Sequence, residues 1–171
     1  MMPLYAIGHS TRTFEQFVQL LQAHAITLLV DIRTVPKSRY NPHFAGESLE
    51  ETLPKEGISY IHIAALGGLR KAQKESIHTS IEHPSFRGYA DHMMSDEFEE
   101  GVAQLLEYAE EQNVAFMCAE GNPFRCHRKM LADLLVARGH TVKHINSKKT
   151  AKEHVVSDLA RLEDDKLIYD Q

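Results

Sequence analysis

The chain has 171 residues, of which 43% are hydrophobic and 25% are charged, a composition typical of one folded domain with its own core. It has no apolar run long enough to cross a bilayer, and we expect no secretory signal in its first residues. The net charge of −5 argues against a surface that coats nucleic acid non-specifically. Two cysteines are too few for a disulfide framework, so we expect free thiols and a cytoplasmic location.

The first elements are read from apolar periodicity and from capping residues. A short apolar run predicts a strand over residues 4–7. Thr13 and Gln16 have the spacing of a capping box, and apolar residues at helical spacing follow them, so a helix is predicted to about His24. A continuous apolar run at 28–32 predicts a strand buried on both faces, as in a parallel sheet covered by helices.

The later elements continue this alternation, apart from the stretch 69–94, which shows no clear period. They are a short helix at 48–54, a strand at 58–63, a helix capped by Ser95, a strand at 114–118, a helix that ends at Gly139 and a strand at 141–145. A second capping box at Thr150–Glu153 predicts a helix in the C-terminal tail. Alternating strands and helices predict an α/β fold with a mainly parallel sheet.

Unusual polar residues follow the predicted strands. They are Gly8–Arg12 after the first strand, Asp31–Arg33 and Pro36–Tyr40 after the second, Leu66–Arg70 after the third and Cys118–Arg128 after the fourth. In open parallel sheets, ligands bind beyond the carboxyl ends of the strands. We therefore expect a single basic site at this edge, with the first and fourth strands close together.

The basic and hydroxyl side chains of this edge suit a phosphate, because arginines and free helix-start amides bind anions. The residues assigned to phosphate binding are Ser10, Thr11, Arg12, Arg33, Arg39, Arg125, His127 and Arg128. The alternative interpretation is that the hydroxyls only cap the first helix and that the loop charges are solvated. Asp31 is expected to support Arg33 as a structural ion pair.

Three residues are candidates for chemistry. Glu120, at a strand end in a basic site, is the expected general acid or base, although it could instead neutralise a neighbouring arginine. His9 is the second acid–base candidate. Cys126, at a helix start among cationic side chains, is expected to have a lowered thiol pKa and is a candidate nucleophile, or else an inert cysteine. Cys118, inside a strand, is expected to be a packing residue.

Several well-known sites do not fit the sequence. It has no Walker loop and no dinucleotide-binding glycine motif. Only one further cysteine follows Cys118, so the zinc deaminase pattern fails. Six residues separate Cys118 from Arg125, one more than in the loop of cysteine phosphatases. A zinc site made from the two cysteines and two histidines would lack the usual paired ligand spacing, so no metal or cofactor is assigned.

The ordered set of motifs resembles the domain of unknown function 488 family. The motifs are Gly8–Arg12, Leu29–Arg33 with Pro36 and Ser38, Gly57–Tyr60 leading to Leu66–Gly68, Met117–Glu120 and Cys126–Arg128. The resemblance covers residues 4–146 and implies a single three-layer Rossmann-like domain, but no established activity. It marks His9, Ser10, Arg12, Asp31, Arg33, Cys118, Glu120, Cys126, His127 and Arg128. The domain is taken as 1–146, and residues 147–171 are expected to form a C-terminal helical extension.

The sequence thus predicts an enzyme that acts on a phosphate-bearing substrate, either a nucleotide or a nucleic-acid end. The arginines would hold the phosphate while Glu120 and His9 exchange protons. One alternative is a non-catalytic module that binds nucleotides or nucleic acid. Another is a metal-dependent hydrolase built on His9, Glu120 and His127. We expect no membrane partner, and the sequence assigns no oligomeric state.

Overall fold

The main element of the fold is a six-stranded sheet with the strand order β3-β2-β4-β1-β5-β6. The computed structural model describes residues 2–122 and 125–171. The sheet consists of β1 (Leu4–Gly8), β2 (Leu28–Asp31), β3 (Ser59–His62), β4 (Val114–Cys118), β5 (Val142–Ile145) and β6 (Ala151–Glu153). The first five strands are mutually parallel, and β6 pairs with β5 in the antiparallel sense. The predicted α/β class with a mainly parallel sheet is confirmed.

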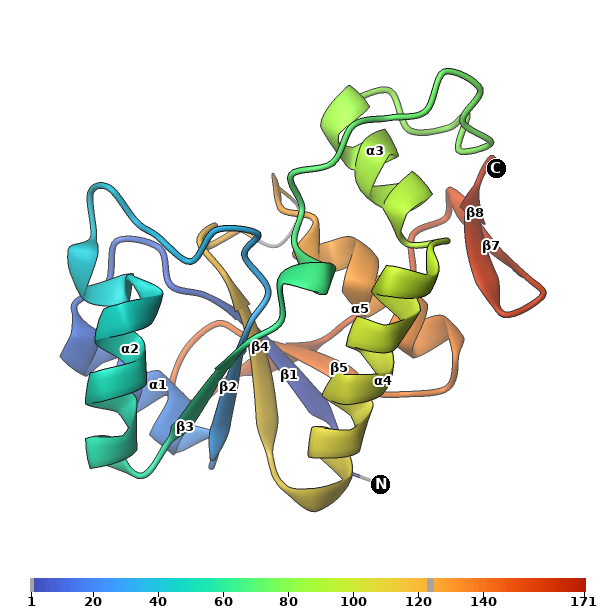
Figure 1. Ribbon diagram of the computed structural model, residues 1–171. Coiled ribbons are helices and arrows are strands. Elements are labelled where there is room, and N and C mark those ends of the chain that lie inside the picture. The colour runs from blue at the N-terminus through green and yellow to red at the C-terminus, as the bar shows by residue number, and fades with distance from the viewer. Residues whose placement is uncertain (1, 123–124) are drawn as a thin grey trace.

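Helices lie on both sides of this sheet (Figure 1). On one side lie α1 (Phe14–Ala23) and α2 (Gly46–Thr52), and on the other lie α4 (Asp96–Glu111) and α5 (Arg128–Ala137), with α3 (Pro84–His92) beyond the end of α4. Two buried clusters fill the spaces between the layers. One includes Phe17 and Leu29, and the other includes Val30 and Leu131. This arrangement is the expected three-layer Rossmann-like domain.

Local sequence features set the helix ends. The Thr13 side chain accepts a hydrogen bond from the Gln16 amide, and the Gln16 side chain accepts one from the Thr13 amide, so the predicted capping box is present. Ser95 caps α4 by accepting from the Phe98 amide at 3.2 Å. Gly139 follows α5 with a φ of +97°, a conformation that glycine adopts without steric cost. None of the helices in the described ranges is long and apolar enough to span a membrane.

The predicted C-terminal helix is wrong, because the tail forms strands. After β6, the strands β7 (Ala160–Glu163) and β8 (Lys166–Tyr169) form an antiparallel hairpin. Its turn lies at Asp164 and Asp165, whose φ angles are +50° and +65°. The capping-box residues at Thr150–Glu153 favour a helix locally, but the same residues can form backbone hydrogen bonds with the otherwise unpaired edge of β5. Tertiary pairing therefore overrides the local preference.

The helix α3 lies in the stretch where no element was predicted. Its buried residues are Gly88, Tyr89 and Ala90, three consecutive positions that give no helical stripe. Pro84 occupies its first turn, where a missing amide proton costs nothing, and the His83 ring accepts from the Ser85 amide. The periodicity therefore could not reveal this helix.

Candidate functional site

The first and fourth strands are neighbours, as predicted. In the parallel pairing of β1 with β4, Gly8 lies opposite Cys118. Beyond the strands, the His9 amide donates to the Cys118 carbonyl oxygen at 3.0 Å, and the Ser10 amide donates to that of Ala119 at 2.9 Å. Ser10 has a φ of +52°, an uncommon conformation for a non-glycine residue. The two segments that carry most of the candidate residues are thus hydrogen-bonded to each other.

Gly8 is the point where these segments meet the start of α5. A Cβ atom at this position would collide with the carbonyl oxygen of Glu120 and would lie 2.8 Å from Nη1 of Arg128. Only a residue without a side chain lets the strand end approach both groups this closely. Gly8 therefore creates the space that the Arg128 side chain occupies.

Arg128 is the first residue of α5, and its side chain is buried, with the residue 2% exposed. Its Nε and Nη1 atoms have no hydrogen-bond partner among the described residues. Arg12 is half-buried and donates to the Gly8 carbonyl oxygen. Burial lowers the pKa of Arg12, and the positive charge of Arg128 lowers it further. In the described part of the chain, neither arginine forms a salt bridge, so two cations lie close together without an acidic partner.

Buried polar atoms without partners are concentrated in the residues that follow the strand ends. Seven such side-chain atoms occur in the described ranges, and five of them belong to four residues predicted to form the site: His9, Arg33, His127 and Arg128. Buried polar atoms in folded proteins nearly always have a partner, and groups that lack one point to an unseen water, ion or ligand. The concentration at this edge is therefore typical of a polar binding site.

The two cysteines form a buried pair behind this edge. The Cys126 thiol donates a hydrogen bond to the Cys118 sulfur, with the two Sγ atoms 2.8 Å apart, and both cysteines are free. This hydrogen bond and the charge of Arg128 lower the pKa of Cys118 against the effect of burial. The bond to Cys118 and burial raise the pKa of Cys126. The expected lowering of the Cys126 pKa is wrong, because the bond to Cys118 and burial outweigh the lowering by Arg128.

Asp31 and Arg33 form the structural ion pair expected from the sequence. The guanidinium contacts both carboxylate oxygens, with Nε–Oδ1 at 2.9 Å and Nη2–Oδ2 at 2.6 Å. The Tyr60 hydroxyl donates to the same carboxylate, and Arg33 donates to the Phe44 carbonyl. Burial acts to lower the pKa of Arg33, but the bonds to Asp31 raise it overall. Arg33 is thus largely committed to Asp31, with Nη1 left unpaired.

The two acid–base candidates differ in exposure. His9 is 2% exposed, stacks on Phe44 with 4.5 Å between ring centroids, and contacts the Ser10 carbonyl through Nδ1 at 2.8 Å. Burial lowers the pKa of His9. Glu120 is exposed, and its Oε1 accepts from the Asn122 amide at 3.1 Å. Since the two residues lie on the two hydrogen-bonded segments, they share one edge of the site.

A sequence model of the family described as "Domain of unknown function DUF488" matches residues 13–135. The chain belongs to this family. The matched range includes Asp31–Arg33 and Cys118–Arg128, and it begins directly after Gly8–Arg12. No curated protein and no solved structure matches the chain. The DUF488 assignment confirms the predicted family.

Some predicted site residues of this DUF488 domain lie away from Arg128 or point elsewhere. Arg39 is exposed and lines a separate surface pocket together with Tyr60 and His62. Thr11 and Arg125 are exposed on the two site loops. None of the pockets found among the described residues is lined by Arg128, which is 2% exposed.

His127 points into the domain. Its ring lies 4.8 Å from that of Tyr89, and it fills the space beside Gly68, where a Cβ atom would collide with the imidazole. Burial lowers the pKa of His127 to about 4, which keeps the ring neutral. Within the described ranges, no group of three His, Cys, Asp or Glu side chains could hold a metal, and this includes the set of His9, Glu120 and His127.

A second polar cluster was not predicted. Asp133 on α5 accepts from His154 Nε2 at 2.7 Å, the Tyr169 hydroxyl at 2.8 Å and the Ser157 amide at 3.1 Å. His154 Nδ1 lies 2.8 Å from His144 Nε2. Because a carboxylate only accepts, His154 donates through Nε2 and accepts through Nδ1, which leaves His144 Nδ1 as an unpartnered buried acceptor among the described residues.

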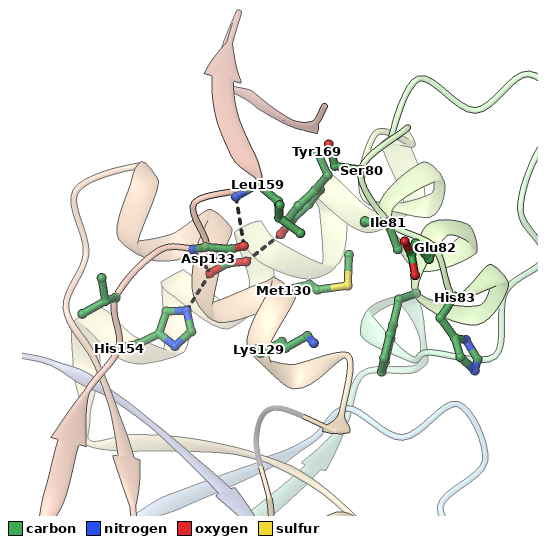
Figure 2. A pocket seen from close by; sticks show the side chains of 13 residues that line it. Ser80, Ile81, Glu82, His83, Lys129, Met130, Asp133, His154, Leu159 and Tyr169 are labelled. Carbon is green, nitrogen blue, oxygen red and sulfur yellow. Dashed lines mark hydrogen bonds and ion pairs between the residues drawn. The ribbon is translucent and has the colours of Figure 1, made fainter. Parts of the chain in front are cut away.

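This cluster lies at the base of a pocket of about 550 Å³ between α3, α5 and the C-terminal segment (Figure 2). The pocket wall is mostly apolar and includes Ile81, Met130 and Leu159. The partners of Asp133 come from parts of the chain more than 20 residues away. No local spacing in the sequence links them, so sequence patterns could not have found this cluster.

Proposed function

We propose that this DUF488 domain is an enzyme that binds the phosphate group of a nucleotide or of a nucleic-acid end at Arg128 and Arg12. The observation that carries the proposal is the buried Arg128 guanidinium, whose Nε and Nη1 lack partners in the described part of the chain. Arg12 beside it is half-buried, and Glu120 is exposed. A ligand would therefore approach past these two residues.

The energetics favour an anion in this place. A buried charge without a partner costs several kcal/mol, and a second cation nearby adds repulsion. A phosphate dianion would offset both costs, and planar guanidinium groups match its oxygens in pairs of hydrogen bonds. Gly8 supports the same interpretation, since its missing side chain leaves Nη1 of Arg128 close to the strand end.

Proton transfer would fall to Glu120 and His9. Because the pKa of His9 is lowered, its ring is neutral, and the Nδ1 proton is held by the Ser10 carbonyl. Nε2 is then a lone-pair acceptor, as a general base requires. Glu120 reaches solvent and could supply or receive a proton. A module that only binds anions would gain nothing from an exposed carboxylate on the same loop edge, which favours an enzyme over a binding module.

The test of binding compares the same arginine-to-glutamine change at a site residue and at an exposed arginine. Arg12→Gln should weaken binding of nucleoside monophosphates and 5′-phosphorylated oligonucleotides about 10- to 150-fold, as expected for a lost charge-assisted bond of roughly 1.5–3 kcal/mol. Arg161→Gln, an exposed control on β7, should change affinity less than about threefold, a screened surface charge being worth roughly 0–1 kcal/mol. Isothermal titration calorimetry measures both. Equal losses in the two variants would contradict a specific site at Arg12 and Arg128.

The test of catalysis uses Glu120→Gln. Phosphate binding should be unchanged or tighter, because a negative charge has left the site. Turnover, measured as phosphate release or transfer over a panel of phosphorylated substrates, should fall roughly 10²–10⁴-fold. Binding without turnover in both the native protein and the variant would support the binding module instead. Weaker binding by the variant would show that Glu120 contacts the ligand directly and would contradict its assigned role.

A further inference from the structure

The Cys118–Cys126 pair has the geometry of a reactive dithiol. Its Sγ atoms lie 2.8 Å apart, although eight positions separate the residues in sequence. Cys118 ends β4, and Cys126 precedes α5 by two residues. They are the only cysteines of the chain. A disulfide between them would need the sulfur atoms to approach by less than roughly 1 Å, given a bond length of about 2.05 Å.

The surroundings distinguish the two sulfur atoms. Cys118 accepts the hydrogen bond from Cys126 and also lies in the positive field of Arg128. Both effects stabilise a thiolate on Cys118, and the thiolate is the nucleophilic form of cysteine. The amide of Arg128 donates to the Cys126 sulfur at 3.5 Å, but Cys126 keeps its proton in the pair. Cys118 is therefore the attacking thiol, and Cys126 is positioned to react second.

We propose that Cys118 and Cys126 form a redox-active dithiol that hydrogen peroxide oxidises to an intramolecular disulfide. The Cys118 thiolate attacks one peroxide oxygen, the O–O bond breaks, and the departing hydroxide takes a proton to become water. Cys118 is then a sulfenic acid. Cys126 loses its proton and attacks the Cys118 sulfur, and the sulfenic oxygen leaves as a second water. In total, two thiols lose two electrons and two protons, and one peroxide becomes two waters.

Burial determines which oxidant fits. Cys118 and Cys126 are 2% and 7% exposed, so a protein or glutathione disulfide cannot reach either sulfur in the folded domain. Hydrogen peroxide is a small neutral molecule and can reach a buried thiolate through small openings. The proximity of Cys126 would also trap the sulfenic acid before further oxidation. This inference does not depend on the proposed phosphate site, since it concerns only the thiol pair and its electrostatic surroundings.

The native chain provides the first measurement. Reduced protein is treated with increasing hydrogen peroxide and followed by intact mass and thiol titration. We expect both thiols to disappear together, with a loss of about 2 Da for two hydrogens, and dithiothreitol added after unfolding in denaturant to restore both. Peptide mapping should find Cys118 linked to Cys126 and separates this change from methionine oxidation. Appearance of sulfinic or sulfonic Cys118 while Cys126 stays a free thiol would overturn the proposal, as would survival of both thiols where free cysteine is fully oxidised.

Two serine variants test the order of attack, and their circular dichroism is compared with the native spectrum first. Cys126→Ser keeps the attacking thiol, so it should form a Cys118 sulfenic acid that dimedone traps when the oxidised protein is unfolded in its presence. Cys118→Ser leaves Cys126 as the remaining thiol, where burial still raises its pKa, so its reaction with peroxide should be at least tenfold slower. Faster reaction of Cys118→Ser than of Cys126→Ser would overturn the assigned roles. The reaction rate of Cys126→Ser should also reach its plateau at a lower pH than that of free cysteine.

Discussion

At the scale of single residues, the site depends on one missing side chain and one buried charge. Gly8 ends β1 where the Glu120 carbonyl and the Arg128 guanidinium both approach its Cα atom. Arg128 is among the largest fully buried side chains of the described residues. From the sequence alone, Gly8 is indistinguishable from an ordinary turn glycine, and Arg128 from a solvated arginine. Their contact gives both a specific structural role.

Gly8→Ala should destabilise the domain by about 1–3 kcal/mol, the usual cost of forcing extra atoms into packed space. The added Cβ would meet a backbone carbonyl, which cannot rotate away as a flexible side chain can. Urea unfolding at neutral pH measures the change in free energy. Gly121→Ala is the matched control, since its Cβ would lie 3.1 Å from Ser10 atoms that can shift slightly. Equal stability of Gly8→Ala and the native protein would show that the Glu120 carbonyl and Arg128 do not pack closely against Gly8.

At the scale of elements, α5 connects the predicted site to the C-terminal segment. Its first residue, Arg128, lies beside Gly8 at the end of β1. Asp133, five residues further along the helix, accepts hydrogen bonds from three residues of the C-terminal segment. The hairpin adds Leu167 and Tyr169 to the same core as α5. The tail is therefore an integrated part of the domain core, although it lies after the family match, which ends at residue 135.

Asp133→Asn should loosen the tail more than the rest of the domain. The amide cannot accept charge-assisted bonds from both His154 and Tyr169, and each such bond contributes roughly 1.5–3 kcal/mol. Hydrogen exchange followed by mass spectrometry should show faster exchange over residues 151–171 than in the native protein. Asp165→Asn, which alters an exposed ion pair with Arg138, is the control and should leave exchange of β8 nearly unchanged. Uniform exchange in both variants would contradict the role of Asp133.

At the scale of the whole molecule, the layered arrangement buries several histidines in neutral form. Burial lowers the pKa of His127 to about 4 and that of His144 to about 3. The ordinary pKa of histidine in an unfolded chain is about 6.5. As the pH falls below this value, these two histidines therefore become protonated in the unfolded state but stay neutral in the folded state.

Stability should consequently be fully present above about pH 6.5 and should decline as the pH falls toward 4. His127→Gln has no proton to gain at this position, so its stability should fall less steeply over the same interval. The difference in unfolding free energy between the native protein and the variant should shrink from pH 7 to pH 4. Urea unfolding at half-unit pH steps measures it. A constant difference would show that His127 titrates normally in the folded protein.

Local patterns were sufficient for most of the main fold. Apolar runs placed β1 to β5, capping residues placed the starts of α1 and α4, and Gly139 placed the end of α5. The motifs at the strand ends also predicted that the first and fourth strands are neighbours. These features depend on a few adjacent residues and on the rule that parallel strands end at one edge, so they can be read along the chain.

Other features were decided only when distant segments met. The C-terminal segment forms strands because one pairs with the edge of β5 and because Leu167 and Tyr169 pack into the core. Its capping-box residues alone would favour a helix. The pKa of Cys126 is raised because Cys118 lies 2.8 Å away and the site is buried, and these effects outweigh the cationic neighbours in sequence. The sequence alone determined where polar residues gather. Tertiary structure decided which are buried, paired or unpaired, because burial and charge depend on atoms that folding brings together from far along the chain.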